Sequence, residues 1–187
     1  MYQYEKEFTS INNIKEPLEK SEFESCKFIN CDFSGISLKE TIFMDCEFVD
    51  CDFSNSKVLK AAFRDVIFRN CKLLGLHFDE CNGIGLSFNF ENCILDHSVF
   101  YNTKIKRTRF INCSLKGVDF SDCDISESNF DSTDLENAIF DNTNLEKADF
   151  TNAENYVIDP ENNRLKSAKF SSSGISGLLT KYRIEII

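Results

Sequence analysis

The chain has 187 residues, enough for one domain with a substantial core, and it contains 19 Phe but no Trp. Its formal net charge of −10 argues against a protein that binds nucleic acid or an anionic membrane surface, because such proteins normally carry a basic patch. No run of about 18 apolar residues is present, so we expect no membrane-spanning helix.

The N-terminal segment 1–20 is charged and lacks the apolar core of a secretory signal. We therefore expect a cytoplasmic protein whose cysteines are free thiols rather than a disulfide framework. The nine cysteines are Cys26, Cys31, Cys46, Cys51, Cys71, Cys81, Cys93, Cys113 and Cys123.

A five-residue period runs through most of the chain. From Leu18 onward a large apolar residue recurs at every fifth position, and a small or thiol residue stands two positions before it. A spacing of five matches neither an α-helix nor a flat strand. A chain that turns a corner every five residues keeps these positions inside, and four such faces make a square coil that stacks on the next at about 4.8 Å. The period therefore predicts an all-β, four-sided solenoid.

Residues 20 apart become vertical neighbours in such a solenoid, so we expect the phenylalanines to form ladders along its axis. Offset aromatic stacks contribute about 0.5–1.5 kcal/mol per pair beyond their buried area. The predicted core-stacking residues are Phe23, Phe28, Phe33, Phe43, Phe48, Phe53, Phe63, Phe68, Phe90, Phe100, Phe110, Phe120, Phe130, Phe140 and Phe150.

The period is interrupted between Phe78 and Phe90, which lie twelve residues apart instead of ten. Two glycines in this stretch, Gly83 and Gly85, permit positive φ and a tight detour. We predict a β-helix over residues 1–155 that consists of two stacked subdomains, 18–78 and 90–155, joined by a register break at 79–89. The sequence leaves open whether the break projects as a loop or forms a bulge.

After Phe150 the repeat fades, and residues 156–187 are predicted to form a C-terminal cap, because the last layer of a solenoid would otherwise face water. The apolar residues after Ser173 have the spacing of a short amphipathic helix, for which a serine is available as N-cap. Residues 183–187 alternate like a strand.

The order small–polar–Phe/Leu–polar–polar resembles the pentapeptide-repeat family over roughly residues 18–155. The resemblance implies a right-handed quadrilateral β-helix. The segment from Cys26 to Gly35, and the Gly-Ile-Gly-Leu-Ser-Phe stretch that precedes Asn92 and Cys93, are similar to the quinolone-resistance members. Toxin-immunity and gyrase-binding members belong to the same group.

The resemblance also implies a homodimer formed through the C-terminal tail. A cap within a single chain is the alternative that the residues leave open. The predicted dimer contacts are Ile175, Leu178, Leu179, Tyr182, Ile184 and Ile186.

No catalytic, metal-binding or cofactor-binding residue is predicted, and we expect no enzyme. A five-residue step moves each cysteine to another face, so four sulfurs do not converge on a zinc ion, and a free cysteine at these positions acts as a small buried residue. His77 and His97 fall on outward positions, without a serine or cysteine placed to act as nucleophile.

Acidic residues are concentrated in one segment of the chain. Between Val118 and Asn163 thirteen acids are opposed only by Lys147, so this stretch carries −12 and the rest of the chain about +2. The predicted partner-binding face comprises Asp119, Asp122, Asp124, Glu127, Asp131, Asp134, Glu136, Asp141, Glu146 and Asp149. Simple solubility of a solenoid with polar outward faces is the alternative explanation.

Duplex DNA carries one negative charge per about 1.7 Å of its axis, and a rigid acidic rod offers a comparable field to a protein that grips DNA. Together with the resemblance, this favours a DNA mimic that binds DNA gyrase or topoisomerase IV and protects it from a toxin or a quinolone. The alternative is a scaffold that binds another protein. Neither hypothesis involves direct contact with nucleic acid or membrane.

Overall fold

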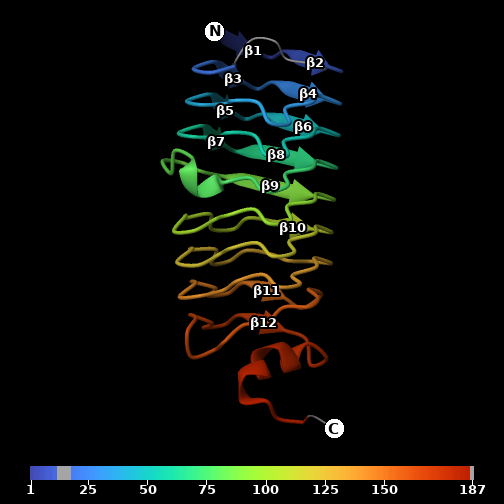
Figure 1. Cartoon of the computed structure of the whole chain (residues 1–187), viewed down its shortest axis with the longest axis vertical. Helices are drawn as coiled ribbons and strands as arrows, with labels where there is room; N and C mark the ends of the chain where they lie inside the picture. The colour runs from blue at the N-terminus through green and yellow to red at the C-terminus, as the bar shows by residue number, and fades with distance from the viewer. Residues whose placement is uncertain (12–17, 186–187) are drawn as a thin grey trace.

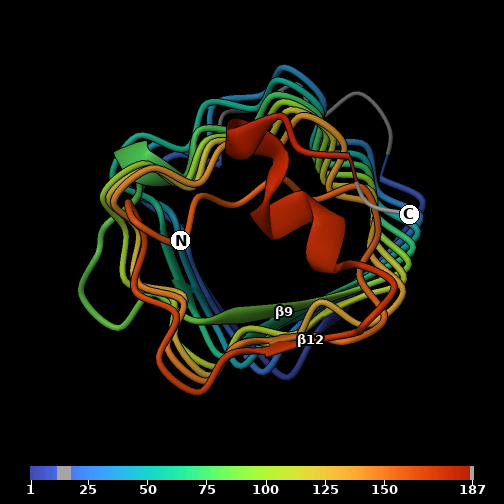
Figure 2. The same cartoon turned by 90° about the horizontal axis from the view of Figure 1, so that it is seen from below.

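The computed structural model, which describes residues 1–11 and 18–185, is a rod of stacked coils with the chain termini at its opposite ends (Figure 1). Seen along the axis, successive coils follow one common outline (Figure 2). The predicted all-β solenoid is confirmed.

Parallel strands build two faces of the rod. The first face carries the four-stranded sheet β1 (Tyr2–Tyr4), β3 (Glu22–Glu24), β5 (Ile42–Met44) and β7 (Ala62–Arg64). The second face carries the six-stranded sheet β2 (Glu7–Thr9), β4 (Lys27–Ile29), β6 (Glu47–Val49), β8 (Val66–Arg69), β9 (Phe88–Glu91) and β10 (Phe110–Ile111), and beyond it the pair β11 (Asp149–Phe150) and β12 (Lys169–Phe170). The third face, which contains Phe33, and the fourth face, which contains Leu38, are joined by single β-bridges.

Each group of five residues follows one pattern. The large residue and the small residue two places before it point inward, as Phe48 and Cys46 do, both at most 1 % exposed. The residue two places after the large one turns the corner with positive φ, for example 55° at Asp50 and 53° at Asn70. Asn and Asp tolerate this left-handed conformation better than other side chains with a Cβ, which explains why they are frequent at the corners.

All fifteen phenylalanines named above are buried. On the second face the rings form a single ladder through the register break, with centroids 4.5–5.3 Å apart and planes within 6–13° of parallel. The ladder consists of Phe8, Phe28, Phe48, Phe68, Phe90, Phe110, Phe130, Phe150 and Phe170. Edge-on contacts link it to the ring columns on the neighbouring faces, as between Phe28 and Phe43.

The coils extend beyond both ends of the clear sequence period. Before Leu18, Phe8 stacks on Phe28, and β1 and β2 pair with β3 and β4. After residue 155, β12 pairs with β11, and Phe170 stacks on Phe150. The pentad pattern is hidden here because Tyr156 and Ile158, both buried, fill the core out of step before Phe170 resumes the second-face ladder.

The register break replaces the first face of one coil. It opens with the 3-10 helix η1 (Phe78–Glu80) and ends where Phe88 packs against Phe78 and Phe90, at 5.0 and 5.1 Å between centroids. Pairing across it shifts from 20 to 22 residues, since Val66 is opposite Phe88. Its tip exposes Ile84 to 77 % and lies outside the common outline of the coils as a short loop (Figure 2).

The predicted short helix in the tail is present, but it is divided into two pieces and the available serine does not cap it. The chain forms two 3-10 helices, η2 (Ile175–Leu178) and η3 (Thr180–Tyr182), and neither has a side-chain cap. Gly177 lies directly against the backbone oxygen of Tyr156, an approach that fits glycine alone. Arg183–Glu185 do not form the predicted strand, because Arg183 adopts positive φ (51°), and residues 186–187 lie outside the described part. None of the described helices has the length and apolar character to cross a membrane.

Candidate functional site

The ten acids of the predicted binding face are distributed around the whole rod. The bridges that stack each coil on the next place Asp124, Glu127 and Glu146 on the first face, Asp131 and Asp149 on the second, Asp134 and Glu136 on the third, and Asp119, Asp122 and Asp141 on the fourth. The reason is geometric, because each five-residue step moves to the next face. The acids therefore form a collar around the second half of the rod, which we call the acidic collar.

Basic residues from neighbouring coils neutralise half of the acidic collar. Lys116 contacts both Asp134 and Glu136, at 3.0 and 2.9 Å. The other pairs are Lys106–Asp124 at 3.2 Å, Arg107–Glu127 at 3.3 Å, Lys147–Glu127 at 3.7 Å and Lys169–Asp149 at 3.1 Å. Exposed pairs of this kind contribute about 0–1 kcal/mol each, so their main consequence is the removal of charge from three faces.

Contacts with basic residues contribute to the lowered pKa values of two of the paired carboxyl groups, Glu127 and Asp149. The hydrogen bond from Arg107 holds the pKa of Glu127 below its ordinary value, and Lys147 adds to the effect. For Asp149 the hydrogen bond from the Thr151 hydroxyl is the largest cause of the lowered pKa, and the contact with Lys169 lowers it further. These carboxylates are therefore charged throughout the physiological pH range.

The other half of the acidic collar has no Lys or Arg within ion-pair distance among the described residues. These acids are Asp119, Asp122, Asp131, Asp141 and Glu146. Three of them lie on the fourth face, where asparagines of the next coil, Asn142 and Asn162, donate to Asp122 and Asp141. Amide donors orient the carboxylates and leave their charge intact, so the fourth face carries the strongest uncompensated negative charge of the collar.

The segment 118–163, which contains the acidic collar, has a linear charge density close to that of duplex DNA. Five cations from flanking coils pair with the segment 118–163, namely Lys106, Arg107, Lys116, Lys169 and Lys181, which reduces its net charge from −12 to −7. Its 46 residues span about 11 Å of the rod axis at roughly 4.8 Å per coil. This corresponds to one charge per about 1.6 Å, against about 1.7 Å for the duplex.

The tail residues that were predicted to make a dimer contact lie at the C-terminal end of the rod. Ile175, Tyr182 and Ile184 are about half exposed, at 49 %, 50 % and 57 %, whereas Leu178 and Leu179 are half-buried. Ile186 lies outside the described residues. Lys181 fastens the tail to the last coil through Asp159 and Glu161, at 2.7 and 2.6 Å.

The two histidines lie apart on the surface. His77 contacts Asp79 at 3.2 Å, and the ring of His97 rests against Gly117 of the next coil. Within residues 1–11 and 18–185, no group of three or more His, Cys, Asp or Glu side chains is arranged to hold a metal ion. All nine cysteines are free, and eight are buried, with Cys81 in the break half-buried.

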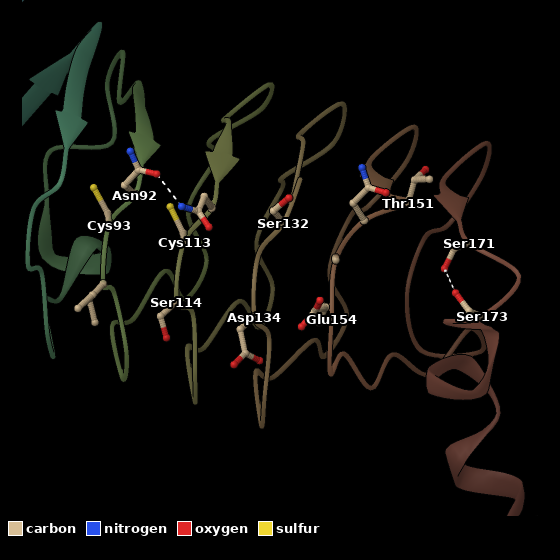
Figure 3. Close-up of a pocket in the computed structure, with 14 residues that line it drawn as sticks. Asn92, Cys93, Cys113, Ser114, Ser132, Asp134, Thr151, Glu154, Ser171 and Ser173 are labelled. Atoms are coloured by element: carbon tan, nitrogen blue, oxygen red, sulfur yellow. Dashed lines mark hydrogen bonds between the residues drawn. The ribbon is translucent and has the colours of Figure 1, made fainter.

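A groove, which the sequence analysis missed, follows the corner between the second and third faces (Figure 3). Asparagine side chains form a ladder along it, in which Asn112 donates to Asn92 at 2.7 Å and Asn92 to Asn70 at 3.2 Å. A second stretch of the same corner groove lies between Asn30 and Lys72. The recurrence of asparagine at positions 30, 70, 92 and 112, with Asp50 in the coil between the first two, is the signal in the sequence that reveals this ladder.

A family model described as a pentapeptide repeat region matches residues 21–89 and 86–156, most of the chain. The chain belongs to the pentapeptide-repeat family. No curated protein sequence matches this pentapeptide-repeat chain significantly.

Solved pentapeptide-repeat structures share the fold. Two structures of trypsin-treated QnrB1, described as a plasmid-mediated fluoroquinolone resistance protein, align with TM-scores of 0.57 and 0.56 at 19 % and 22 % identity. Both alignments cover 100 % of this chain, and they cover 97 % and 98 % of the QnrB1 chains. HetL from the cyanobacterium Nostoc, described as involved in the regulation of heterocyst differentiation, aligns with a TM-score of 0.55 at 15 % identity over 91 % of this chain and 86 % of HetL. At these identities the likeness concerns the fold.

Proposed function

We propose that the chain is a non-catalytic, cytoplasmic binding protein whose acidic collar occupies the DNA-binding groove of a protein, with a type II topoisomerase such as DNA gyrase or topoisomerase IV as the partner. The observation that carries the proposal is the match between the charge density of the segment 118–163, which contains the collar, at one charge per about 1.6 Å, and that of duplex DNA. Bound in this way, the rod excludes DNA from the groove and protects the enzyme from a quinolone or toxin that acts on its DNA complex.

The fourth face is the surface that we assign to the closest contact with the partner. Asp119, Asp122 and Asp141 there remain uncompensated, and the coils hold them at a regular spacing along a rigid axis. A basic groove gains most from charges that are not already paired, because a paired carboxylate must first lose its lysine or arginine. The likeness to QnrB1, whose description names fluoroquinolone resistance, supports a topoisomerase as the partner to test first.

The test is a supercoiling assay with purified gyrase, with and without the protein, each in the presence and absence of a quinolone. We expect inhibition of supercoiling at high protein concentration and restored activity in the presence of the drug, both weaker at high salt. No effect in any arm over a wide concentration range would remove gyrase as the partner and leave the scaffold hypothesis, in which another protein binds the rod.

We also propose that two copies meet through the C-terminal end. Ile175, Tyr182 and Ile184 expose apolar surface there, and Val157 on the last coil adds to it with 53 % exposure. Joining two rods end to end covers this surface and doubles the length of the acidic rod. Light scattering on the purified protein tests the proposal, and a monomeric mass at micromolar concentration contradicts it.

A further inference from the structure

Five cysteines occupy one vertical column inside the corner between the second and third faces. Each stands two residues before a core residue of the third face, and the 20- and 22-residue spacings of the coils place them above one another. The column consists of Cys31, Cys51, Cys71, Cys93 and Cys113. All are at most 4 % exposed.

Four of the five thiols of this column share one orientation, whereas Cys113 keeps only the contact with the backbone oxygen two residues before it, Ile111, at 3.3 Å. The Sγ of Cys51 contacts the backbone oxygens of Phe28 and Val49, at 3.5 and 3.3 Å. The same pair of contacts, at 3.2–3.5 Å, recurs at Cys31, Cys71 and Cys93. Equal contacts in successive coils mean equal rotamers, so the sulfurs of these four residues repeat at the coil spacing of about 4.8 Å. The parallel bridge between Ile94 and Ser114 places the backbone of Cys113 one coil from that of Cys93.

Four of the five thiols adjoin the corner groove. Cys93 and Cys113 line its C-terminal stretch, where Figure 3 shows them on neighbouring coils. Cys31 and Cys51 line the N-terminal stretch. Cys71, between the two pairs, lines neither. The groove therefore provides an entry path to two pairs of stacked thiols.

We propose that the pairs Cys31–Cys51 and Cys93–Cys113 each bind one soft cation of the Cu(I), Ag(I) or Hg(II) class in linear two-coordinate geometry. A bond between a metal ion and a thiolate is about 2.3 Å long, so two bonds in line span about 4.6 Å, close to the spacing of the sulfurs. Thiolate ligands select soft cations. Zinc requires four ligands, whereas no three candidate ligands converge in the described part of the chain.

The charge balance suits a buried site. One Hg(II) replaces the protons of both thiols and leaves a neutral S–Hg–S unit, with two protons released to solvent. One Ag(I) or Cu(I) replaces a single proton and leaves the second sulfur as a neutral thiol. Neither product buries a net charge, which would be costly in this core.

The test uses Hg(II) as the probe in the presence of excess 2-mercaptoethanol, because a preorganised pair of thiols outcompetes two independent monothiols. We expect the protein to retain two Hg(II) per chain by mass spectrometry under native conditions. X-ray absorption should give two sulfur neighbours per mercury at about 2.3 Å. Complete loss of mercury to the monothiol, or three or more sulfur neighbours, overturns the proposal.

Serine variants locate the sites. Ser56 and Thr133 already stand at such inward positions and donate to the equivalent carbonyls, at 2.7 and 2.8 Å, so serine preserves the coil. The variant with serine at all four groove cysteines should retain no mercury, with an unchanged circular dichroism spectrum. The matched control replaces Cys26, Cys46, Cys81 and Cys123, which do not line the groove, and should retain two. Equal retention by the two variants contradicts the assignment.

Discussion

The two halves of the rod share one core but have different surfaces. We call the coils that precede the register break in the sequence the lower half and those that follow it the upper half; Figure 1 draws the lower half at the top. On the first and second faces of the lower half, the three- and four-residue strands β3 to β8 lie between the corners. In the upper half, most pairings are single bridges followed directly by a turn, as from Asp119 to Ser121 and from Asn129 to Asp131. The distribution of charge differs as well, because the upper half contains the segment 118–163, in which Lys147 is the only basic residue among thirteen acids.

The outward residue before each core position accounts for much of this difference. In the upper half it is often Asp or Asn, whose side-chain oxygen accepts the backbone N–H two residues on and tightens the turn, as Asp119 does from Ser121 at 2.8 Å. On the first and second faces of the lower half, the same position holds residues without this ability, such as Lys27 and Ile67. Lys104 and Ile139 precede turns too, so the side chain favours the turn without being required for it.

The comparison shows that one residue type serves two purposes. Aspartates of the upper half such as Asp119 and Asp124 shape the coil and also supply the charge of the acidic collar. Asparagine retains the first property and lacks the second, whereas alanine lacks both. Substitutions can therefore separate the stability of the rod from its proposed binding.

The largest expected effect concerns the shared core. Phe48→Ala in the lower half and Phe110→Ala in the upper half should each lower the free energy of unfolding by about 3–5 kcal/mol, because both rings are 0 % exposed and stacked on rings above and below. Urea denaturation measures both. Tyr101→Ala, at a position 48 % exposed, is the control and should stay within about 0.5 kcal/mol. A clearly smaller loss for Phe110→Ala would show that the upper half is less tightly packed.

The next effect concerns the ends of the rod. Ile184→Asp places a charge in the proposed dimer contact and should weaken self-association at least tenfold, about 1.4 kcal/mol. Analytical ultracentrifugation over a concentration series measures it. Ile84→Asp makes the same change at the exposed tip of the register break and should leave the dimer intact. If both variants associate like the wild type, the contact lies elsewhere.

A smaller effect on stability distinguishes the hydrogen bond that Asp119 accepts in its turn from the negative charge of the same side chain. Asp119→Ala removes the acceptor for the Ser121 N–H and should cost about 1 kcal/mol of stability, whereas Asp119→Asn keeps an acceptor and should cost much less. Thermal denaturation of the two variants and the wild type gives the difference. Equal losses for Ala and Asn would mean that the charge of Asp119, and not its turn, stabilises the rod.

The smallest effect is the acid response. The pKa values of Glu127, Asp149 and Asp159 are lowered by contacts with Arg107, Thr151 and Lys181 respectively. A lowered pKa in the folded state contributes stability that is complete above the unfolded value of about 4 and is lost as the pH falls through the folded value.

Hydrogen exchange, corrected for the intrinsic rate at each pH, should therefore show protection falling more in the upper than in the lower half between about pH 5 and pH 2. Among the described residues of the lower half, only Asp32 has a lowered carboxyl pKa, through its hydrogen bonds from Ser34. A uniform loss of protection along the rod would contradict the difference between the halves.

The inward positions could be predicted from the sequence because a strict five-residue period admits one kind of coil, and residues such as Phe23 and Cys26 are buried accordingly. The conformation of the tail could not be predicted from the sequence, because it depends on the close approach of Gly177 to Tyr156, a contact between segments that no local pattern encodes. The acids were identifiable, but their pairing was not. Whether an aspartate forms an ion pair depends on residues one coil away: Asp134 pairs with Lys116, whereas Asp122 accepts a hydrogen bond from Asn142.

The central claim is that uncompensated carboxylates of the acidic collar recognise a DNA-binding groove, and equilibrium binding to purified gyrase tests it most directly. Two variants each remove three negative charges. The collar variant carries Asp119→Asn, Asp122→Asn and Asp141→Asn, and the lower-half variant carries Asp45→Asn, Asp50→Asn and Asp65→Asn. We predict that the wild-type protein binds gyrase with an affinity that falls with salt. The collar variant should bind at least tenfold more weakly, while the lower-half variant binds like the wild type. Equal affinities for the two variants, or binding that does not respond to salt, would contradict it.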